Sequence, residues 1–488
     1  MTFGATAIGL GLGLAAATTA TAQTVETKQY ADGGVYEGTF ANGRPDGTGT
    51  YTLPNGYQYS GDWVNGEISG QGTARFPDGA VYVGQFAAGK PSGKGKITFA
   101  DGGSYEGDWT DGKMTGIGLV TYANGVTYQG ELRGGLPNGQ GKMTAPDGFI
   151  YEGTWANGVR QGQGTLTYPD GSSYTGQLAD GNRDGDGTLT TAAGLIYKGT
   201  WTMGQINGQG SLTWPNGDSY EGDFVDGQRE GSGKVSYANG DVYQGSFHND
   251  LREGQGSFQG KDGMSYIGTW KAGKMEGTGT LTYPDGSVYN GDFVAGLPEG
   301  QGKITYPDGA TYEGGWAHGL IDGQGTATYA DGTTYTGGFV AARFDGKGKL
   351  TRPDGYSYDG DWKNGQRDGT GTATYPNGAV YIGGFSEGLR SGTGKLTVPD
   401  DPATPEDDSF TYDGDWSNGE MSGMGTATYG NGDVYAGQFA AGQRQGQGTL
   451  RFSNGDTQTG VWQDNLLPAQ PAPDATAPDA ATTDINGN

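Results

Sequence analysis

A single motif recurs every 23 residues along almost the whole chain. The motif contains a Tyr-x-Gly triplet, and its tyrosines are Tyr36, Tyr59, Tyr82, Tyr105, Tyr128, Tyr151, Tyr174, Tyr197, Tyr220, Tyr243, Tyr266, Tyr289, Tyr312, Tyr335, Tyr358 and Tyr381. The next one, Tyr412, follows after 31 residues, because eight residues are inserted around 400–408. Tyr435 resumes the period, and Gln458-Thr459-Gly460 is an incomplete last copy. This period predicts a repeat protein of about 19 units.

Each unit contains two segments with the alternation of a β-strand. In one copy the alternating residues are Tyr266, Gly268 and Trp270, followed by Gly277, Gly279, Leu281 and Tyr283. Residues two apart in a strand share a face, so the ring-bearing and glycine positions face the same side. Short turns such as Asn42-Gly43 and Asn364-Gly365 join the segments, which requires antiparallel neighbours.

The composition indicates how such strands pack. Glycine fills 102 of the 488 positions, hydrophobic residues make up only 32% of the chain, and aromatic residues make up 11%. A conventional core is excluded, and we expect large rings to lie over glycine backbones of neighbouring strands. The predicted fold is all-β: an elongated antiparallel β-hairpin repeat array of about 38 strands in a single continuous twisted sheet, with a polar opposite face.

The residue four positions after each tyrosine alternates between tryptophan and a smaller ring or leucine. It runs Phe40, Trp63, Phe86, Trp109, Leu132, Trp155, Leu178, Trp201 and Phe224, and the alternation restarts at Phe247 and Trp270. Either the gene grew by doubling pairs of units, or alternate hairpins meet different neighbours. The sequence leaves both accounts open.

The sequence predicts three regions. Residues 1–22 have the apolar run and the Ala20-Thr21-Ala22 site of an export signal, with cleavage expected after Ala22. Its n-region is atypical, since no Lys or Arg precedes the apolar run, so the start codon is itself in question. Residues 28–465 form the array, with the insertion loop at 400–408, and residues 466–488 form a disordered Pro/Ala/Asp-rich tail. The expected location is periplasmic or secreted.

The repeat resembles the MORN (membrane occupation and recognition nexus) repeat. The resemblance rests on Tyr-x-Gly-x-(Trp/Phe), Gly-x-Gly and (Asp/Asn)-Gly at a spacing of 23 residues, over residues 30–465. It implies β-hairpin arrays that act as scaffolds or accessory modules, with members linked to phospholipid membranes or to dimerisation. It fits an exported, bacterial, repeat-only member. Family members that are enzymes carry an additional kinase or methyltransferase domain, which this sequence lacks, so we expect no enzymatic activity.

Charge and motif chemistry exclude several other functions. The net charge of −26 argues against nucleic-acid binding, and the absence of cysteine excludes disulfides and thiolate metal sites. Gly-x-Gly pairs such as Gly47 and Gly49 lack the helix that a phosphate loop needs. The Asp-Gly turns offer single carboxylates rather than a calcium cage. Asp407-Asp408 is a weak candidate for a glycosidase pair, and His248 and His318 are expected at surfaces or turns. We expect no cofactor, metal or catalytic residue.

Basic residues recur near the hairpin tips and suggest a contact edge for anions. They are Arg44, Lys90, Lys113, Arg160, Arg183, Arg229, Arg252, Lys274, Arg343, Arg367, Arg390 and Arg444, of which Arg160, Arg183, Arg229, Arg252, Arg367, Arg390 and Arg444 are the selected candidates. Acidic neighbours, as in Arg183-Asp184 and Arg229-Glu230, are expected to neutralise this edge locally.

Two functional hypotheses follow. The first is a non-enzymatic exported scaffold that binds protein partners or an envelope component. The second is a module that binds phospholipid head groups or polysaccharide. The array ends also offer a route to a homodimer, and the protein partners themselves are not identified by the sequence.

Overall fold

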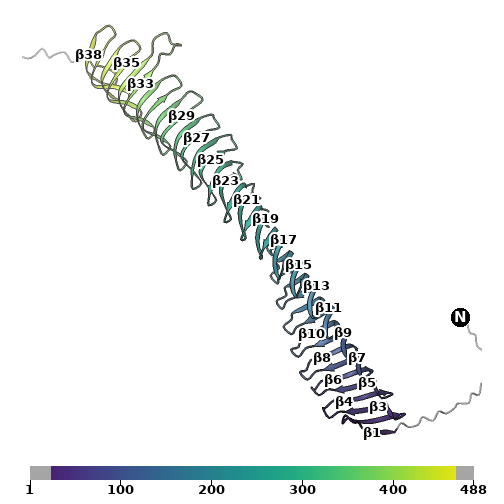
Figure 1. Ribbon diagram of the computed structural model, residues 1–488. Helices are drawn as coiled ribbons and strands as arrows, with labels where there is room; N and C mark the ends of the chain where they lie inside the picture. Colours follow the sequence, from purple (N-terminus) through teal and green to yellow (C-terminus); the bar gives the residue numbers. More distant parts are fainter. Residues whose placement is uncertain (1–23, 469–488) are drawn as a thin grey trace, which may run out of the picture. The chain divides into compact units, whose positions relative to one another are not determined.

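The computed structural model describes residues 24–468, and all the regular structure in this part of the chain is β-strand. Thirty-eight strands form one antiparallel sheet that is not closed, with successive hairpins following one another along the chain (Figure 1). The predicted fold class and strand number are therefore confirmed. The expected signal peptide at 1–22 and the tail from residue 469 onward lie outside the described residues.

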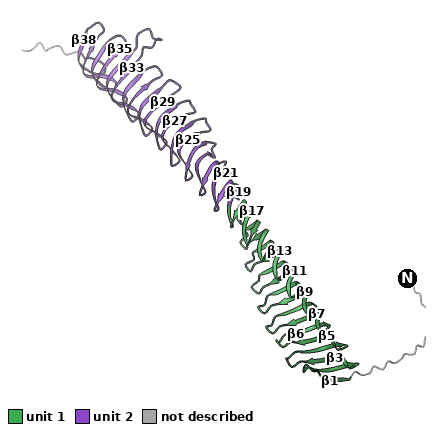
Figure 2. Cartoon of the chain, viewed as in Figure 1, with its two compact units in different colours: residues 1–229 green, residues 230–488 purple. Residues whose placement is uncertain are grey.

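The chain divides into two compact units, residues 1–229 and residues 230–488 (Figure 2). The strands of the first unit are β1 (Val25–Gln29), β2 (Val35–Ala41), β3 (Arg44–Thr52), β4 (Gln58–Val64), β5 (Glu67–Arg75), β6 (Val81–Ala87), β7 (Lys90–Thr98), β8 (Ser104–Thr110), β9 (Lys113–Thr121), β10 (Thr127–Arg133), β11 (Leu136–Thr144), β12 (Ile150–Ala156), β13 (Val159–Thr167), β14 (Ser173–Ala179), β15 (Asn182–Thr190), β16 (Ile196–Thr202), β17 (Gln205–Thr213) and β18 (Ser219–Val225).

The second unit begins within β19 (Gln228–Ser236). It continues with β20 (Val242–His248), β21 (Leu251–Gln259), β22 (Ser265–Lys271), β23 (Lys274–Thr282), β24 (Val288–Val294), β25 (Leu297–Thr305), β26 (Thr311–Ala317), β27 (Leu320–Thr328), β28 (Thr334–Val340), β29 (Arg343–Thr351), β30 (Ser357–Lys363), β31 (Gln366–Thr374), β32 (Val380–Ser386), β33 (Leu389–Val398), β34 (Phe410–Ser417), β35 (Glu420–Tyr429), β36 (Val434–Ala440), β37 (Gln443–Arg451) and β38 (Thr457–Trp462).

Two kinds of turn alternate along each unit. The two central residues of each hairpin turn have positive φ, as at Asp111 (51°) and Gly112 (77°), which is the type I′ geometry that suits twisted antiparallel strands. The connection between hairpins is longer. At Phe76–Ala80 the Phe76 N–H donates to the Ala80 carbonyl at 2.8 Å, and Asp78 Oδ1 accepts from the Ala80 N–H at 3.0 Å. The (Asp/Asn)-Gly pairs are therefore turn residues, as predicted.

The insertion lengthens one of these connections without changing the pairing of the strands around it. Strand β33 ends at Val398 and β34 begins at Phe410, and these two residues still pair with each other. The exposed loop between them is closed by Asp408 Oδ1, which accepts from the Asp401 N–H at 2.8 Å.

Tyrosine rings lying over glycine hold neighbouring strands together. The Tyr-x-Gly tyrosines are buried, and each ring lies over the glycine of the second strand of its own hairpin. A Cβ added at Gly210 would lie 2.6 Å from both Cε2 and Oη of Tyr197, so only glycine leaves room for the ring. The tyrosines also meet other rings edge-on: Tyr82 lies 5.0 Å from Phe86 of its own strand and 5.0 Å from Trp109 of the next hairpin, whereas among the described residues Tyr128 meets Trp155 alone, because Leu132 occupies the ring position of its own strand.

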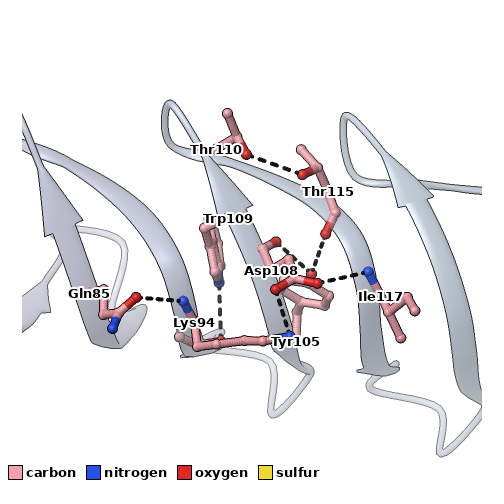
Figure 3. Close-up of polar contacts among 9 residues, drawn as sticks. Gln85, Lys94, Tyr105, Asp108, Trp109, Thr110, Thr115 and Ile117 are labelled. Atoms are coloured by element: carbon pink, nitrogen blue, oxygen red, sulfur yellow. Dashed lines mark hydrogen bonds and ion pairs between the residues drawn. The ribbon is translucent and has the colours of Figure 1, made fainter.

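Each hairpin contains a bulge that polar atoms stabilise, as the unit at Tyr105 shows (Figure 3). The Tyr105 hydroxyl donates to the carbonyls of Asp108 (2.7 Å) and Thr115 (3.0 Å), and Asp108 Oδ2 accepts from the Ile117 N–H at 3.1 Å. The Lys94 ammonium, 2.6 Å from Asp108 Oδ1, holds the pKa of Asp108 below its usual range. The side chain three positions after the tyrosine therefore caps the bulge.

Replacing Gly210 with alanine should destabilise the protein by about 3 kcal/mol, because the added methyl group overlaps the Tyr197 ring. The control is Gly204→Ala in the turn of the same hairpin. A Cβ there meets nothing within 4 Å, so the cost is only the positive φ of 88°, about 1 kcal/mol. Urea unfolding followed by circular dichroism measures both. Equal costs for the two substitutions would contradict the packing of rings on glycine.

Alkaline pH should unfold the array. Burial raises the pKa of Tyr82, Tyr174 and Tyr266 from 10.0 to about 12. A raised pKa in the folded state means that this contribution to stability is complete below about pH 10 and is lost as the pH rises toward 12. Tyrosinate absorbance should therefore appear together with loss of the β-sheet signal, whereas the urea-unfolded chain should ionise near pH 10. Ionisation of all tyrosines near pH 10 with an intact β-sheet signal would refute this.

Candidate functional site: the aromatic face

We call the side of the sheet that carries the buried tyrosines the aromatic face. Four residues after each tyrosine comes the ring position, for example Trp155. The second residue after each hairpin turn pairs directly with the ring position, as Arg160 pairs with Trp155, and we call it the slot position. Every tryptophan at the ring position donates its indole N–H to a glycine carbonyl of the preceding strand, as Trp155 does to Gly141 at 3.2 Å.

The slot position holds two kinds of side chain. In eleven units it holds Pro45, Ile68, Pro91, Met114, Pro137, Ile206, Met275, Pro298, Ile321, Phe344 or Met421. In the other seven it holds Arg160, Arg183, Arg229, Arg252, Arg367, Arg390 or Arg444, which are the candidates selected from the sequence. All seven arginines are half-buried, so a guanidinium takes the place of an apolar side chain in these units.

The guanidinium groups lie over rings of the aromatic face. Arg183 lies 3.9 Å from the ring centroid of Trp201, and its Nη2 donates to the Gly204 carbonyl of the next turn at 2.8 Å. Arg390 lies 4.1 Å from the Trp416 ring and donates to the Gly419 carbonyl at 2.9 Å. Stacking of this kind is worth about 0.5–2 kcal/mol, depending on desolvation.

The remaining candidates follow the same arrangement with different partners. Arg160 donates to the Gly181 carbonyl at 3.1 Å, and Arg444 lies 4.5 Å from the Trp462 ring. Arg252 lies between Tyr243 (4.7 Å) and Trp270 (4.8 Å). Arg367 lies 4.9 Å from Phe385 and donates to the Tyr356 hydroxyl at 2.6 Å, and Arg229 lies 5.6 Å from Tyr220.

Sequence reasoning grouped these arginines with all other basic residues near the tips, but the structure divides the set in two. Arg44, Lys90, Lys113, Lys274 and Arg343 occupy the first residue after the turn and are exposed. The seven arginines are one residue further on and therefore face the opposite side. The signal was available in the sequence, because the residue two positions after the turn alternates onto the ring-bearing face.

The acidic residues that follow the arginines bond to the next hairpin turn. Asp184 Oδ2 accepts from the Met203 N–H at 3.0 Å, and Glu253 Oε2 accepts from the Ala272 N–H at 2.8 Å. Each of these donors is a turn residue with positive φ. These carboxylates therefore contribute to the turn structure in addition to their charge.

The aromatic face is hollowed at the consecutive slot arginines Arg160 and Arg183, and also in units without a slot arginine. A cavity of about 720 Å³ is lined by Phe149, Trp155, Tyr168, Arg160 and Arg183, among others. A second cavity of about 490 Å³, near the first strands, is lined by Tyr30, Tyr36, Tyr51, Trp63 and Arg44, among others. Desolvation raises the pKa of Tyr151, which Arg160 partly opposes. The face thus offers rings and N–H donors side by side.

Metal sites, histidine chemistry and membrane-spanning helices have little support in the part of the chain that the structure describes. Between residues 24 and 468, no group of three or more His, Asp or Glu side chains could hold a metal ion. His318 lies in a hairpin turn, and His248 lies at the exposed end of β20, 2.8 Å from Glu230, which raises the pKa of the imidazole. The same residues include no helix of the length and apolarity needed to cross a membrane.

Comparison with protein families identifies the repeat. The model of the MORN repeat matches 18 segments, at residues 36–56, 59–81, 82–104, 105–127, 128–149, 151–173, 174–195, 197–219, 220–242, 243–265, 266–288, 289–311, 312–334, 335–355, 358–380, 381–401, 412–434 and 435–457. The chain belongs to the MORN repeat family. The incomplete copy at Gln458 and residues 402–411, which include most of the insertion loop, fall outside the matched segments.

Comparison with solved structures finds matches that include three distant ones. The TCP domain of Drosophila melanogaster SAS-4, solved with a proline-rich motif of Ana2, is 17% identical, with a TM-score of 0.19 over 38% of this MORN protein and 85% of that domain. The TCP10 domain of Danio rerio CPAP is 15% identical, with a TM-score of 0.12 over 70% and 100% of the two chains. Virginiamycin B lyase from Staphylococcus aureus is 11% identical, with a TM-score of 0.11 over 57% and 90%. The search of curated protein sequences gave no significant match.

Replacing Arg183 with methionine should leave stability nearly unchanged, within about 1 kcal/mol, because methionine fills the same slot position at Met114, Met275 and Met421. Replacing it with aspartate should cost about 3 kcal/mol, since an unpaired carboxylate would lie half-buried against Trp201. Urea unfolding measures both variants. Equal stability of the aspartate and methionine variants would show that the slot position is not packed.

Proposed function

We propose that this MORN repeat protein is a non-enzymatic, exported scaffold whose aromatic face binds extended, acidic segments of protein partners. The observation that carries the proposal is the pairing of arginine with tryptophan along the hollowed face, as at Arg183 and Trp201. Export rests on the signal pattern of residues 1–22. The absence of a further domain in the repeat region supports a binding role rather than catalysis.

The arginines retain the capacity to recognise a ligand after making their own contacts. Arginine has five N–H donors. In Arg183, Nη2 donates to the Gly204 carbonyl, and the plane of the guanidinium lies over the Trp201 ring. A planar guanidinium that is held in this way is pre-organised for a bidentate bond to a carboxylate. The net charge of −26 makes such local positive sites selective, because acidic partners are repelled elsewhere on the protein.

The form of the ligand follows from the form of the face. Slot and ring positions recur once per unit, and the apolar slot residues alternate irregularly with arginines along the face. An extended segment lays successive side chains over successive units. Its acidic residues can therefore meet slot arginines, and its apolar residues can meet apolar slot residues. Part-exposed rings such as Tyr306 (36% exposed) and Tyr329 (43%) add sites for stacking.

A phospholipid head group is the second candidate, because phosphate also accepts bidentate bonds from arginine. The seven slot arginines provide this chemistry. Because they are half-buried, they suit a narrow peptide better than a flat membrane surface. Liposome binding is therefore an alternative outcome of the test below.

The test uses a fluorescent peptide that alternates aspartate with proline, and a matched peptide with lysine in place of aspartate. The purified protein should bind the acidic peptide, and the double variant Arg160→Met, Arg183→Met should bind it about tenfold or more weakly, since each charged hydrogen bond is worth about 1.5–3 kcal/mol. Methionine occurs at the slot position elsewhere, so this variant keeps its fold.

The control is Lys113→Met, which removes an exposed charge from the first position after a turn and should leave affinity unchanged. Co-sedimentation with phosphatidylglycerol vesicles is measured with the same variants. Equal binding of both peptides, or vesicle binding that depends on Arg160 and Arg183 without peptide binding, would overturn the proposal.

A further inference from the structure

Strand β1 corresponds to the second half of a hairpin, and within residues 24–468 it pairs with β2 alone. Strand β1 pairs with β2 through Glu26↔Gly38 and Lys28↔Tyr36. Strand β7, the second strand of a complete hairpin, pairs with β8 in the same register through Gly95↔Gly107 and Ile97↔Tyr105. By this equivalence Val25–Gln29 stand where Lys94–Thr98 stand in a complete unit.

Strand β38 corresponds to the first half of a hairpin, whose second half is described only as far as Pro468. After β38 the chain makes a turn at Asp464-Asn465, both with positive φ, and Leu466 forms a bridge with Gln463. Leu467 then packs over Gly460, where a Cβ would lie 2.7 Å from its Cδ1. Pro468 follows. Within residues 24–468, the rest of β38 pairs with β37 alone.

We propose that β1 of one copy pairs antiparallel with β38 of a second copy and completes this last hairpin. In complete hairpins the register is that of Tyr82↔Ile97 and Gly84↔Gly95. Transferred to the outer edges of β1 and β38, it places Gln458 opposite Lys28 and Gly460 opposite Glu26 of the second copy. Leu466 and Leu467 supply the part of the second strand before the bulge, and β1 supplies the part after it.

The departures from the repeat at the two ends fit one another in this register. In complete hairpins the tyrosine ring lies over a glycine that has no room for a side chain, as Tyr197 lies over Gly210. At the proposed junction the tyrosine is replaced by Gln458 and the glycine by Glu26. The shorter glutamine leaves space for the glutamate, and Lys28 beside them supplies a partner of opposite charge.

The opposite face of the junction buries two exposed valines. Val25 is 67% exposed and Val461 is 59% exposed. They take the places of Lys94 and Gln85, which are neighbours in a complete hairpin, since the Lys94 N–H donates to Gln85 Oε1 at 3.1 Å. The two valines therefore come into contact across the junction, and each loses its exposed apolar surface.

Such a contact is heterologous, because the two surfaces that meet are different. Each copy keeps a free β1 or a free β38 after joining, so association does not stop at two copies. It also covers the outer edges of β1 and β38, whose N–H and C=O groups have no strand partner within residues 24–468.

Disulfide trapping tests the junction, since the natural chain contains no cysteine. Val25→Cys chains mixed with Val461→Cys chains under mild oxidation should give a covalent dimer, and the chain with both substitutions should give a ladder of covalent oligomers. The control replaces Val294, which is 52% exposed on β24, and pairs Val294→Cys with Val461→Cys. The Val25–Val461 pair should cross-link about tenfold faster or more, because the bound junction raises the effective concentration of the two thiols.

A second pair of variants separates edge pairing from random collision. Gln458→Tyr should reduce cross-linking about tenfold, because the ring takes the space of Glu26, and Glu26→Gly in the other chain should restore it. Equal rates for Val25 and Val294, faster pairing of Val461→Cys with itself, or no effect of Gln458→Tyr would each overturn the proposal. Peptide binding is measured separately, so failure here leaves the proposed function standing.

Discussion

The structure depends on the close contact between a tyrosine ring and the glycine of the neighbouring strand. This contact replaces the aliphatic core that the chain lacks, because each ring is buried against glycine backbone and against the side chains at the ring positions, which for Tyr82 are two rings edge-on. An edge-on ring pair contributes about 0.5–1.5 kcal/mol beyond the burial of its area. Since the contacts join only residues of one hairpin or of consecutive hairpins, stability is shared along the array rather than concentrated in one place.

The sequence was sufficient for the strands, the turns and the ring-on-glycine contacts, because period-two alternation and (Asp/Asn)-Gly pairs report local geometry directly. It was not sufficient to predict which basic residues lie on the aromatic face and which lie on the opposite face of the sheet. Lys113 lies one residue before the slot residue of its own hairpin, Met114, and a shift of one position in a strand exchanges its two faces. The capping of the bulge by Asp108 also escaped prediction, since it joins residues on two strands.

The slot position connects the fold to the candidate site. It accepts proline, isoleucine, methionine, phenylalanine or arginine. Each of these side chains is large enough to pack against the residue at the ring position of the paired strand. Because arginine satisfies that packing with its flat side, a charged donor enters the aromatic face without the usual penalty for burial. The acidic residue beside it is engaged by the next turn, as Asp184 is by Met203, which leaves the guanidinium to its ring and carbonyl.

The loop between β33 and β34 shows that the connection between hairpins is a permissive position. Eight additional residues are accommodated there while Val398 still pairs with Phe410. The pairing of the strands on either side therefore does not depend on the length of this loop. Equivalent connections recur at each 23-residue step. The protein is consequently suited to the display of inserted peptides. Foreign epitopes or enzyme recognition sequences grafted at chosen connections would be presented at intervals set by the repeat, and the pairing of the strands would be unchanged.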